Sequence, residues 1–311
     1  MKIFNNFEQL KSEISHSELN VTIGNFDGVH LGHQDFLAYI KKESDKLKRE
    51  MVVVTFVPHP SFVLKGRTNF LINTYSERRQ LLKNLGVDIL IELDFNRDFS
   101  TLTPESFLHN YLFSLNSIKK IYLGHDFQFG ANKTGNFELA KKEAQKFGVD
   151  LILYSEFKLS NEKISSTEIR ALINSGTFEK VTNLLGRDFY LSGRVIKGQG
   201  RGRQIGFPTA NLGYDKDSII PSKGVYITKT TIADLVYESV TNVGVNPTFN
   251  TGYDIHIETH ILGFSRDIYG DEIKVSFLKK LRDEKKFSSV NELVNQITSD
   301  VLDVKKHFGH V

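Results

Sequence analysis

The sequence contains no cysteine and no tryptophan, and its 40 basic residues exceed its 37 acidic residues by only three. Without cysteine there is no disulfide, no thiolate metal site and no cysteine nucleophile. No apolar run approaches the ~20 residues that span a bilayer, and residues 1–20 lack the apolar core of a signal peptide. The near balance of charge argues against a nucleic-acid coat protein. These absences predict a soluble cytoplasmic protein with neither a membrane nor a nucleic-acid partner.

What is present is typical of a globular protein. The chain has 311 residues, of which 40% are hydrophobic, and its 24 phenylalanines and 11 tyrosines can fill a core. This length favours two domains over one. The small positive excess suits anionic small molecules bound at local sites.

The first half alternates between strand and helix patterns. Apolar or β-branched runs at 21–24, 51–57, 88–93, 118–124 and 151–157 are expected to be strands. Helices are expected between them, with Phe36, Leu37, Ile40 and Leu47 at helical spacing in the first. Three further helices are expected: one behind a Thr74–Glu77 capping box, one over 104–115, and one over 137–148 that ends on Gly148. This rhythm predicts a parallel sheet with helices on both faces and ligands at the carboxyl ends of its strands.

The pattern changes near residue 186. Short β-rich runs at 189–196, 224–233, 235–245, 253–262 and 272–278 favour an antiparallel barrel or sandwich. A final amphipathic helix is expected behind a Ser289–Glu292 capping box, with an apolar face of Val290, Leu293, Val294, Ile297, Val301 and Val304. The predicted domains are therefore 1–185 and 186–311.

The first chemical motif is TIGNFDGVHLGH at 22–33. A strand ends at Gly24, the chain turns through Gly28, and His30 and His33 bracket Gly32 at the start of a helix. Free N–H groups and the positive dipole end suit a phosphate, and two imidazoles on one helix face can donate to its oxygens. The alternatives are two surface histidines beside a turn, or a zinc site, which lacks a third ligand.

The second motif is ISSTEIR at 164–170. Ser165 and Glu168 have capping-box spacing, so helix initiation is one explanation. The other is that Ser166, Thr167 and Arg170 donate to a polyphosphate at the same helix start. The two are compatible.

Together, HLGH and ISSTEIR resemble the nucleotidylyltransferase superfamily. GNFDGVHLGH, TFVPHP, GHDFQFG and ISSTEIR are similar to the adenylyltransferase half of the bacterial bifunctional riboflavin kinase/FAD synthetase family. KGQGRGRQIGFPTANL, GVY, NVGVNPTF, ETHIL with DIYG, and LRDEKKF resemble its riboflavin kinase half in order and spacing. The resemblance covers nearly the whole chain. It implies an α/β plus β fold: a Rossmann-like nucleotidylyltransferase domain, followed by an antiparallel riboflavin kinase β-barrel with a C-terminal helix.

In the kinase half, the glycine-rich segment at 198–203 is not a dinucleotide or Walker loop, because we expect it to open no helix and no Lys-Ser/Thr follows. The resemblance makes it a basic flap over ATP phosphates, using Gly198, Gly202 and Arg203. It also implies that Thr209 and Asn211 bind ATP and hold Mg²⁺, an ion that prefers oxygen ligands.

The strand at 253–262 is expected to present Ile255, Ile257 and Ile261 on one face, with His256, Glu258 and His260 on the other. A merely solvated polar face would explain the second set. The resemblance makes Glu258 the general base for the ribityl hydroxyl of riboflavin, and Arg282 and Phe287 flavin-binding residues.

For the adenylyltransferase half, the resemblance implies that His30 and His33 are catalytic and that His59 and Phe62 bind flavin. The residues implied to bind ATP are Gly24, Phe26, Gly28, Asp126, Ser166, Thr167 and Arg170. Two positions depart from the family pattern: Asn246 stands where arginine is frequent, and Asp126 stands where some members have asparagine.

The predicted function is a two-step synthesis. The C-terminal domain would phosphorylate riboflavin with ATP to give FMN and ADP, and the N-terminal domain would adenylylate FMN with ATP to give FAD and pyrophosphate, with Mg²⁺ in both. Alternatives are that one activity is retained, or that the protein is a non-catalytic flavin- or RNA-binding regulator. An aminoacyl-tRNA synthetase would need a lysine-bearing second motif and a tRNA-binding appendage. The oligomeric state is left open.

Overall fold

The computed structural model describes residues 1–14, 17–125, 127–155, 158–159, 162–198, 200–248 and 252–310. The chain folds into two compact units, Met1–Ser166 and Thr167–Val311. The predicted boundary between the two catalytic domains, after residue 185, stays a prediction. No helix in these described stretches is long and apolar enough to cross a membrane.

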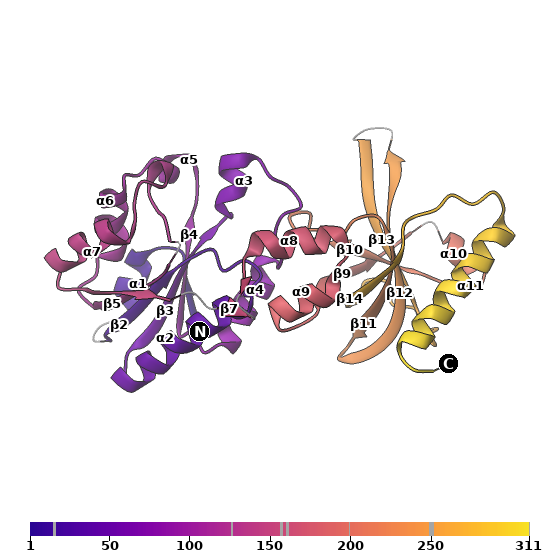
Figure 1. The fold of residues 1–311 in the computed structure, drawn as a ribbon, viewed down its shortest axis with the longest axis horizontal. Helices are drawn as coiled ribbons and strands as arrows, with labels where there is room; N and C mark the ends of the chain where they lie inside the picture. The colour runs from indigo at the N-terminus through magenta and orange to yellow at the C-terminus, as the bar shows by residue number, and fades with distance from the viewer. Residues whose placement is uncertain are drawn as a thin grey trace. The chain divides into compact units, whose positions relative to one another are not determined.

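A six-stranded sheet forms the centre of the first unit (Figure 1). All its neighbouring strands pair in parallel, in the order β1-β4-β3-β2-β5-β6. The strands are β1 (Lys2–Phe4), β2 (Leu19–Ile23), β3 (Glu50–Val57), β4 (Ile89–Asp94), β5 (Ile118–Gly124) and β6 (Asp150–Tyr154). The predicted parallel sheet is confirmed. The order reverses at β2, so the loop that follows β2 lies at the switch point where such sheets bind ligands.

Helices cover both faces of this sheet, as the alternating rhythm predicts. The helices of this unit are α1 (Phe7–Glu13), α2 (Leu31–Leu47), α3 (Pro60–Lys65), α4 (Tyr75–Asn84), α5 (Arg97–Ser100), α6 (Pro104–Phe107), a π-helical turn η1 (Leu108–Leu112), a 3-10 turn η2 (Ala131–Lys133) and α7 (Phe137–Lys146). A short antiparallel pair, β7 (Lys158–Leu159) with β8 (Glu162–Lys163), follows β6.

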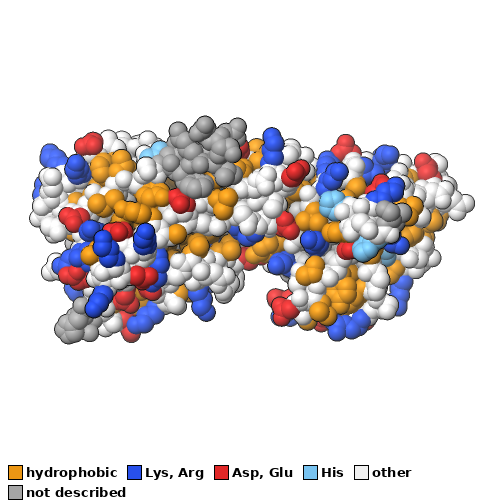
Figure 2. All heavy atoms as spheres, turned by 60° about the horizontal axis from the view of Figure 1, so that its bottom comes forward, with side chains coloured by type: hydrophobic (Ala, Val, Ile, Leu, Met, Phe, Trp, Pro, Cys, Tyr) orange, Lys and Arg blue, Asp and Glu red, His pale blue; other side chains and the backbone are white. Residues whose placement is uncertain are grey.

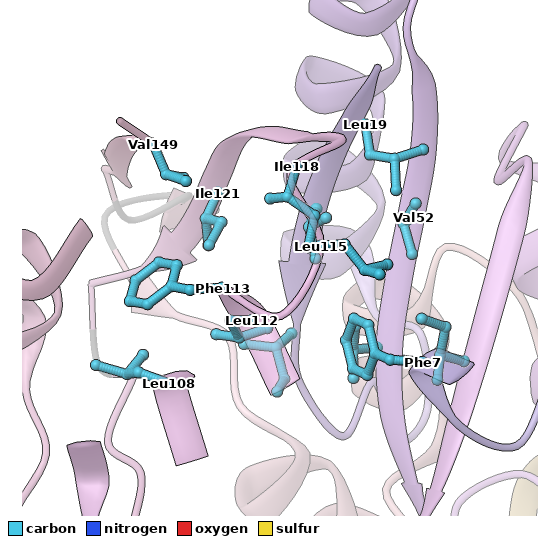
Figure 3. Packing of buried hydrophobic residues seen from close by; sticks show 14 of the residues in the cluster. Phe7, Leu19, Val52, Leu108, Leu112, Phe113, Leu115, Ile118, Ile121 and Val149 are labelled. Atoms are coloured by element: carbon cyan, nitrogen blue, oxygen red, sulfur yellow. The ribbon is translucent and has the colours of Figure 1, made fainter. Parts of the chain in front are cut away.

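The core is split by the sheet into two layers. On one side, Phe7 of α1 and the residues around η1 pack against Val52 and Ile121 (Figure 3). On the other side, Leu37 and Ile40 of α2 and Leu82 of α4 pack against the opposite faces of β3 and β4. Because the centre of the sheet is covered on both faces, β3 and β4 are mostly apolar runs rather than alternating ones.

Several local expectations of the first unit are met and two need correction. The Thr74–Glu77 capping box is present, with both of its hydrogen bonds. The helix expected over 104–115 is shorter, since α6 gives way to a π-helical turn at Leu108. Leu47 ends α2, as its helical spacing predicts, and is 38% exposed. The strand expected over 151–157 ends at Tyr154.

The second unit is a closed six-stranded barrel, which confirms the barrel and excludes the sandwich (Figure 1). Its strand order is β10-β13-β12-β11-β14-β9, and every pair is antiparallel. The elements are α8 (Ser166–Ser175), which begins at the limit of the units, α9 (Phe178–Leu185), β9 (Phe189–Ile196), α10 (Arg201–Gln204), β10 (Ala210–Tyr214), β11 (Gly224–Ile232), β12 (Leu235–Thr248), β13 (Gly252–Ile261), β14 (Glu272–Arg282) and α11 (Val290–His307).

Two helices cover parts of the barrel. Phe178 of α9 is 1% exposed and its ring lies 5.4–6.0 Å from the rings of Phe189, Tyr226 and Phe277. Val304 of α11 is buried in a second cluster with Val225. The aromatic content of the sequence therefore serves this core as predicted.

The C-terminal helix α11 departs from its expectation at its first turn. Ser289 caps α11, but the Glu292 carboxylate accepts from Ser288 instead of completing a reciprocal box. Val290 is 61% exposed and so lies off the buried face.

Side chains of both charges mix on the surface. Figure 2 shows lysine and arginine side chains interspersed with aspartate and glutamate over one face of the molecule. The interspersion agrees with the small net charge of the sequence.

Candidate active sites

The loop that follows β2 is tightly shaped by its own side chains. Phe26 has a φ of +47° and its buried ring covers Gly24, where a Cβ would lie 3.1 Å from Phe26 Cε2. Gly28 has a φ of +82°, and a Cβ there would lie 3.0 Å from Ile72 Cδ1. Glycine is favoured at Gly28 because its positive φ strains other residues, and a Cβ there would also press on Ile72.

Two further contacts fix this loop from outside. The buried carboxylate of Asp27 accepts from the Ile72 backbone N–H at 3.0 and 3.3 Å. The Asp27 carbonyl accepts from the Ser166 hydroxyl at 2.9 Å. Ser166 therefore reaches the loop through its hydroxyl group.

His30 is the N-cap of α2. Its Nδ1 accepts from the His33 backbone N–H at 3.3 Å, and the side chain of His30 is buried. Because a neutral imidazole accepts at one nitrogen and donates at the other, this cap places the proton of neutral His30 on Nε2. A Cβ on Gly32 would lie 3.3 Å from the same Nδ1, so the small residue between the histidines leaves room for the cap.

His33 stacks on His30. The ring centroids are 3.6 Å apart with planes 15° apart, and the edge of Phe26 lies 5.2 Å from the His33 ring. Burial, together with the neighbouring His30 imidazole, lowers the pKa of His33 well below 6.5. The lowered pKa favours a neutral His33 imidazole at the start of α2, stacked on His30.

His59 and Phe62 lie in the segment that follows β3. His59 is the N-cap of α3, its Nδ1 accepting from Ser61 N–H at 3.1 Å, and only 6% of His59 is exposed. Its ring lies 5.0 Å from Phe70 and 6.4 Å from Phe62. These contacts give His59 a structural role that does not depend on flavin binding beside Phe62.

The GHDFQFG segment after β5 borders a cavity of about 550 Å³. The lining residues are His125, Phe127, Gln128, Lys133, Asn136, Phe137 and Glu138. Lys133 brings a cation and Phe127 an aromatic ring, a combination that suits a ligand with both an anionic and a planar part. Asp126 itself lies outside the described residues.

In the second unit, Glu258 lies in a cluster of polar side chains on the outside of the barrel. It is directly opposite Asn211 of β10 and Asn242 of β12, and the residues beside it on β13, Ile257 and Thr259, are buried. The Thr209 hydroxyl donates to Glu258 Oε2 at 3.4 Å. The predicted two-faced strand is confirmed, and it brings Thr209, Asn211 and Glu258 together.

The glycine-rich segment packs closely on this cluster. A Cβ on Gly198 would come within 2.2 Å of Asn211 Nδ2, and one on Gly202 within 2.3 Å of the Phe207 carbonyl oxygen. The expectation that the segment opens no helix is wrong, because Arg201–Gln204 form a single helical turn, α10. The absence of Lys-Ser/Thr still distinguishes it from a Walker loop. Arg203 is exposed on α10.

His260 and Gly244 complete the surroundings of Glu258. A ring nitrogen of His260 lies 2.8 Å from the Pro208 carbonyl oxygen and holds the segment that leads to Thr209. A Cβ on Gly244 would lie 2.8 Å from Glu284 Oε1 and 3.0 Å from His256 Nε2. Glu284, from the segment after β14, therefore reaches the same face as Glu258.

Arg282 ends β14 in a network with the C-terminal helix. Its guanidinium donates to the Asp300 carboxylate at 3.0, 3.2 and 2.7 Å, and Gln296 donates to the same carboxylate at 2.9 Å. The Phe287 ring lies 5.9 Å from Arg282 Cζ. Arg282 and Phe287 thus come together as the sequence predicts.

Comparison with known proteins assigns the two halves to two family models. The model for FAD synthetase matches residues 12–168, and the model for riboflavin kinase matches residues 185–308. The bifunctional riboflavin kinase/FMN adenylyltransferase of Buchnera aphidicola from Acyrthosiphon pisum is 36% identical over 99% of both chains. This chain belongs to the bifunctional riboflavin kinase/FMN adenylyltransferase family.

Other relatives of the family agree. The bifunctional riboflavin kinase/FMN adenylyltransferase of Bacillus subtilis is 34% identical over 94% of this chain and 93% of its own. A crystal structure described as a macrolide-efflux protein from Streptococcus pneumoniae is 34% identical and covers 97% of this chain and 98% of that one, with a TM-score of 0.85. The family resemblance of the sequence motifs is therefore confirmed along the whole chain.

The limit between the two compact units falls inside the second predicted motif. Thr167 and Arg170 lie on α8 in the second unit, beyond the limit that follows Ser166. Arg170 is 9% exposed. The side chain of Asn246 lies outside what the structure describes, so its departure from the family pattern stays a prediction without a structural test.

The sequence analysis missed several residues that hold these sites. Asp27 stands inside the first motif without an assigned role, although a carboxylate between glycines and aromatics is a signal of a loop fixed by backbone N–H groups. Gly244 lies inside the NVGVNPTF motif but was given no role, and Asp300 carried no signal of its own. Gly244 matters only because β13 and the segment after β14 lie against it, and Asp300 only because β14 brings Arg282 under α11.

Proposed function

We propose that this chain makes FMN and then FAD at two separate sites. The second unit transfers the γ-phosphoryl group of ATP to riboflavin, giving FMN and ADP. The first unit joins FMN to the α-phosphorus of a second ATP, giving FAD and releasing pyrophosphate. The observation that carries this proposal is that the FAD synthetase and riboflavin kinase models match different halves of one chain.

In the kinase reaction, Glu258 accepts the proton of the ribityl hydroxyl as that oxygen attacks the γ-phosphorus. Its support is the hydroxyl of Thr209, which donates to Glu258 Oε2 at 3.4 Å, and the position of Glu258 opposite Asn211 and Asn242 on the neighbouring strands. Gly198, Gly202 and Arg203 close over the ATP phosphates, where small residues let the backbone approach and Arg203 adds charge. Arg282 and Phe287 hold the flavin.

Mg²⁺ is the metal that we assign to this site. The Thr209 hydroxyl, the Asn211 amide oxygen and the nearby Glu258 carboxylate are oxygen donors of the kind that this ion prefers, and there are few of them, as expected for an ion that keeps waters and shares the phosphates. When bound, Mg²⁺ neutralises the charge of the transferred phosphoryl group. The adenylyltransferase site is expected to need it for the same reason.

In the adenylyltransferase reaction, the phosphate of FMN is already an anion, so the attack needs no strong base. The task of the protein is to bind the triphosphate and to stabilise the charge that develops on it. His30 donates from Nε2, the N–H that its capping role leaves to it, and His33 adds a second imidazole at the same helix start.

The remaining assignments follow the motif. Gly24, Phe26, Gly28, Asp126 and Ser166 shape or line the ATP site, with Thr167 and Arg170 as further donors. His59 and Phe62 lie on the flavin side. The use of ATP implies a cytoplasmic reaction.

The test is to incubate the purified chain with riboflavin, ATP and Mg²⁺ and to follow FMN and FAD by chromatography. We expect FMN to rise first and FAD to follow, and both to fail without Mg²⁺. FMN that accumulates without FAD, or FAD made only when FMN is added, would mean that one activity is lost. Flavin binding without either product would favour the regulator alternative.

A further inference from the structure

The loop that follows β2 and the segment that follows β3 are fastened to the same short stretch of α4. This stretch is Tyr75 and Arg78, one helical turn apart, with the Arg78 guanidinium 5.0 Å from the Tyr75 ring centroid. Residues three apart on a helix share one face. Neither residue belongs to a motif that we connected with substrate binding.

Arg78 fastens the loop that carries the histidines. It is 2% exposed, and its Nη1 donates to the Asn25 carbonyl oxygen at 3.0 Å. The Thr55 hydroxyl donates to the same carbonyl at 3.3 Å. A guanidinium is a rigid fork of donors, so this contact fixes the direction of the Asn25 peptide as well as its position.

Glu92 of β4 holds the guanidinium in place. Arg78 Nη2 donates to Glu92 Oε1 at 3.2 Å, and both side chains are nearly inaccessible to solvent. Arg79 donates from Nε to the other carboxylate oxygen at 2.9 Å, but it is 42% exposed. Arg79 thus shares the anchor without extending to the loop, which makes it a matched control.

Tyr75 fastens the segment that follows β3. Its hydroxyl oxygen accepts from the His59 backbone N–H at 2.7 Å. His59 is the N-cap of α3, so this bond sets where α3 begins and where Phe62 lies. The two substrates of the adenylyltransferase reaction are expected on these two segments, ATP on the first and flavin on the second.

We propose that Tyr75 and Arg78 are positioning residues that set the ATP loop and the flavin segment at a fixed separation. The proposal rests on the function proposed above. The proposal assigns neither side chain a contact with the reacting atoms. Arg78 acts through the Asn25 carbonyl, and Tyr75 acts through the His59 N–H. Since a misplacement of about 1 Å can cost ~100-fold in rate, the separation of the two segments matters directly for attack on the α-phosphorus.

The experiment compares Arg78→Lys, Tyr75→Phe and Arg79→Lys in the full chain, with steady-state rates of FMN adenylylation at varied ATP and varied FMN. Lysine keeps the buried charge but cannot bridge two acceptors. We expect Arg78→Lys to lower kcat about 10- to 100-fold, since positioning is lost in the transition state. Tyr75→Phe should raise KM for FMN about fivefold, the effect of one lost hydrogen bond, with KM for ATP unchanged. Arg79→Lys should match wild type within about twofold, because lysine keeps a cation beside Glu92 and the contacts of Arg79 with Glu92 do not reach either segment.

Riboflavin phosphorylation in the same samples is the internal control, and melting temperature is recorded for every variant. Equal KM for FMN in Tyr75→Phe and wild type, or equal loss in Arg78→Lys and Arg79→Lys, overturns the proposal. So does a fall of both activities together with the melting temperature, because α4 would then only hold the fold. If Arg78→Lys does not fold, Arg78→Met with Glu92→Gln removes both buried charges at once, and normal FAD synthesis in that variant also overturns it. A wild-type chain that makes no FAD would contradict the proposed function instead.

Discussion

His30 and His33 stack face to face, with their ring centroids 3.6 Å apart. Such contact between two imidazoles is stable only if they are not both charged, and the lowered pKa of His33 fits a neutral ring. In the proposed adenylyltransferase reaction, the pair would therefore meet the triphosphate with polarised N–H groups rather than with two full charges. Donors of this kind act most strongly where charge develops during the reaction.

We expect His30→Ala with His33→Ala to suppress FAD synthesis strongly. Each lost transition-state donor costs roughly 2.7–4 kcal/mol in comparable sites, so turnover should fall more than FMN binding weakens. The measurement is the rate of FMN adenylylation beside FMN affinity by flavin fluorescence. Riboflavin phosphorylation should stay near wild type. Unchanged FAD synthesis, or a joint loss of both activities with thermal stability, would contradict the catalytic role.

The lowered pKa of His33 also predicts how stability depends on pH. Above about pH 6.5, His33 is neutral in the folded and the unfolded chain alike, and it contributes no difference. Below that pH the unfolded chain takes up a proton that the buried ring resists, so the free energy of unfolding falls as the pH drops.

Hydrogen exchange of the β2 backbone amides, recorded at increasing urea concentration, measures the free energy of unfolding of the first unit. The stability of wild type should decline between pH 6.5 and 5.5, and His33→Asn should flatten that part of the decline. His307→Asn, at an exposed position of α11, is the control and should leave it unchanged. An identical decline in His33→Asn and wild type would show that other groups cause it.

Glu258→Gln should nearly abolish FMN formation and leave the conversion of FMN to FAD intact. A positioned base contributes typically ~10²–10⁴ in rate, and the amide keeps both the shape and an oxygen that accepts from Thr209. Initial rates of both reactions measure this. Glu272→Gln, at an exposed position of β14, should leave both rates unchanged. Near-normal phosphorylation by the Glu258 variant would leave it as part of a merely solvated strand face.

Much of this architecture could be predicted from the sequence because the signals are local. The run at 51–57 predicts a strand covered on both faces, and β3 (Glu50–Val57) is such a strand. The alternation at 255–261 predicts which side of the barrel Glu258 occupies, and the register with Asn211 confirms it. The glycines of the first motif and of the glycine-rich segment at 198–203 predict a close approach of the backbone to its neighbours. At Gly28 and Gly198 a Cβ would lie 3.0 Å or less from a neighbouring side chain.

The residues that hold the sites were not predictable, because their partners come from distant segments. Arg78 and Arg79 are adjacent and chemically identical, yet the Arg78 side chain is 2% exposed and the Arg79 side chain 42% exposed. Only the position of Glu92 on β4 and of the Asn25 carbonyl distinguishes them. The apolar face of α11 likewise gives no sign that Asp300 is buried beside Val304.

Asp300→Asn is expected to affect the kinase site through Arg282. Removing one partner of a fully buried ion pair costs ~3–5 kcal/mol, and less is expected here since 15% of the Arg282 side chain is exposed. Without the carboxylate, the Arg282 guanidinium is no longer held in place for flavin binding. KM for riboflavin should therefore rise, while FMN adenylylation stays normal. Asp303→Asn on the same helix, where the pair with Lys306 is exposed, is the control. An unchanged KM for riboflavin would separate Arg282 from flavin binding.

The last prediction concerns where the kinase module begins. A fragment of residues 188–311 contains the whole barrel but lacks α9, whose Phe178, Val181 and Leu185 are buried. Removing a buried phenylalanine alone costs ~3–5 kcal/mol, so this fragment should be much less stable than one of residues 177–311, which keeps α9 and its Thr177 N-cap. Thermal unfolding, followed by circular dichroism, and the rate of riboflavin phosphorylation are measured for both fragments. We expect the longer fragment to make FMN but no FAD at 37 °C, and the shorter one to be largely unfolded there. Equal melting temperatures would show that α9 is not part of the barrel core, and a folded longer fragment without kinase activity would contradict the assignment of that reaction to the second unit.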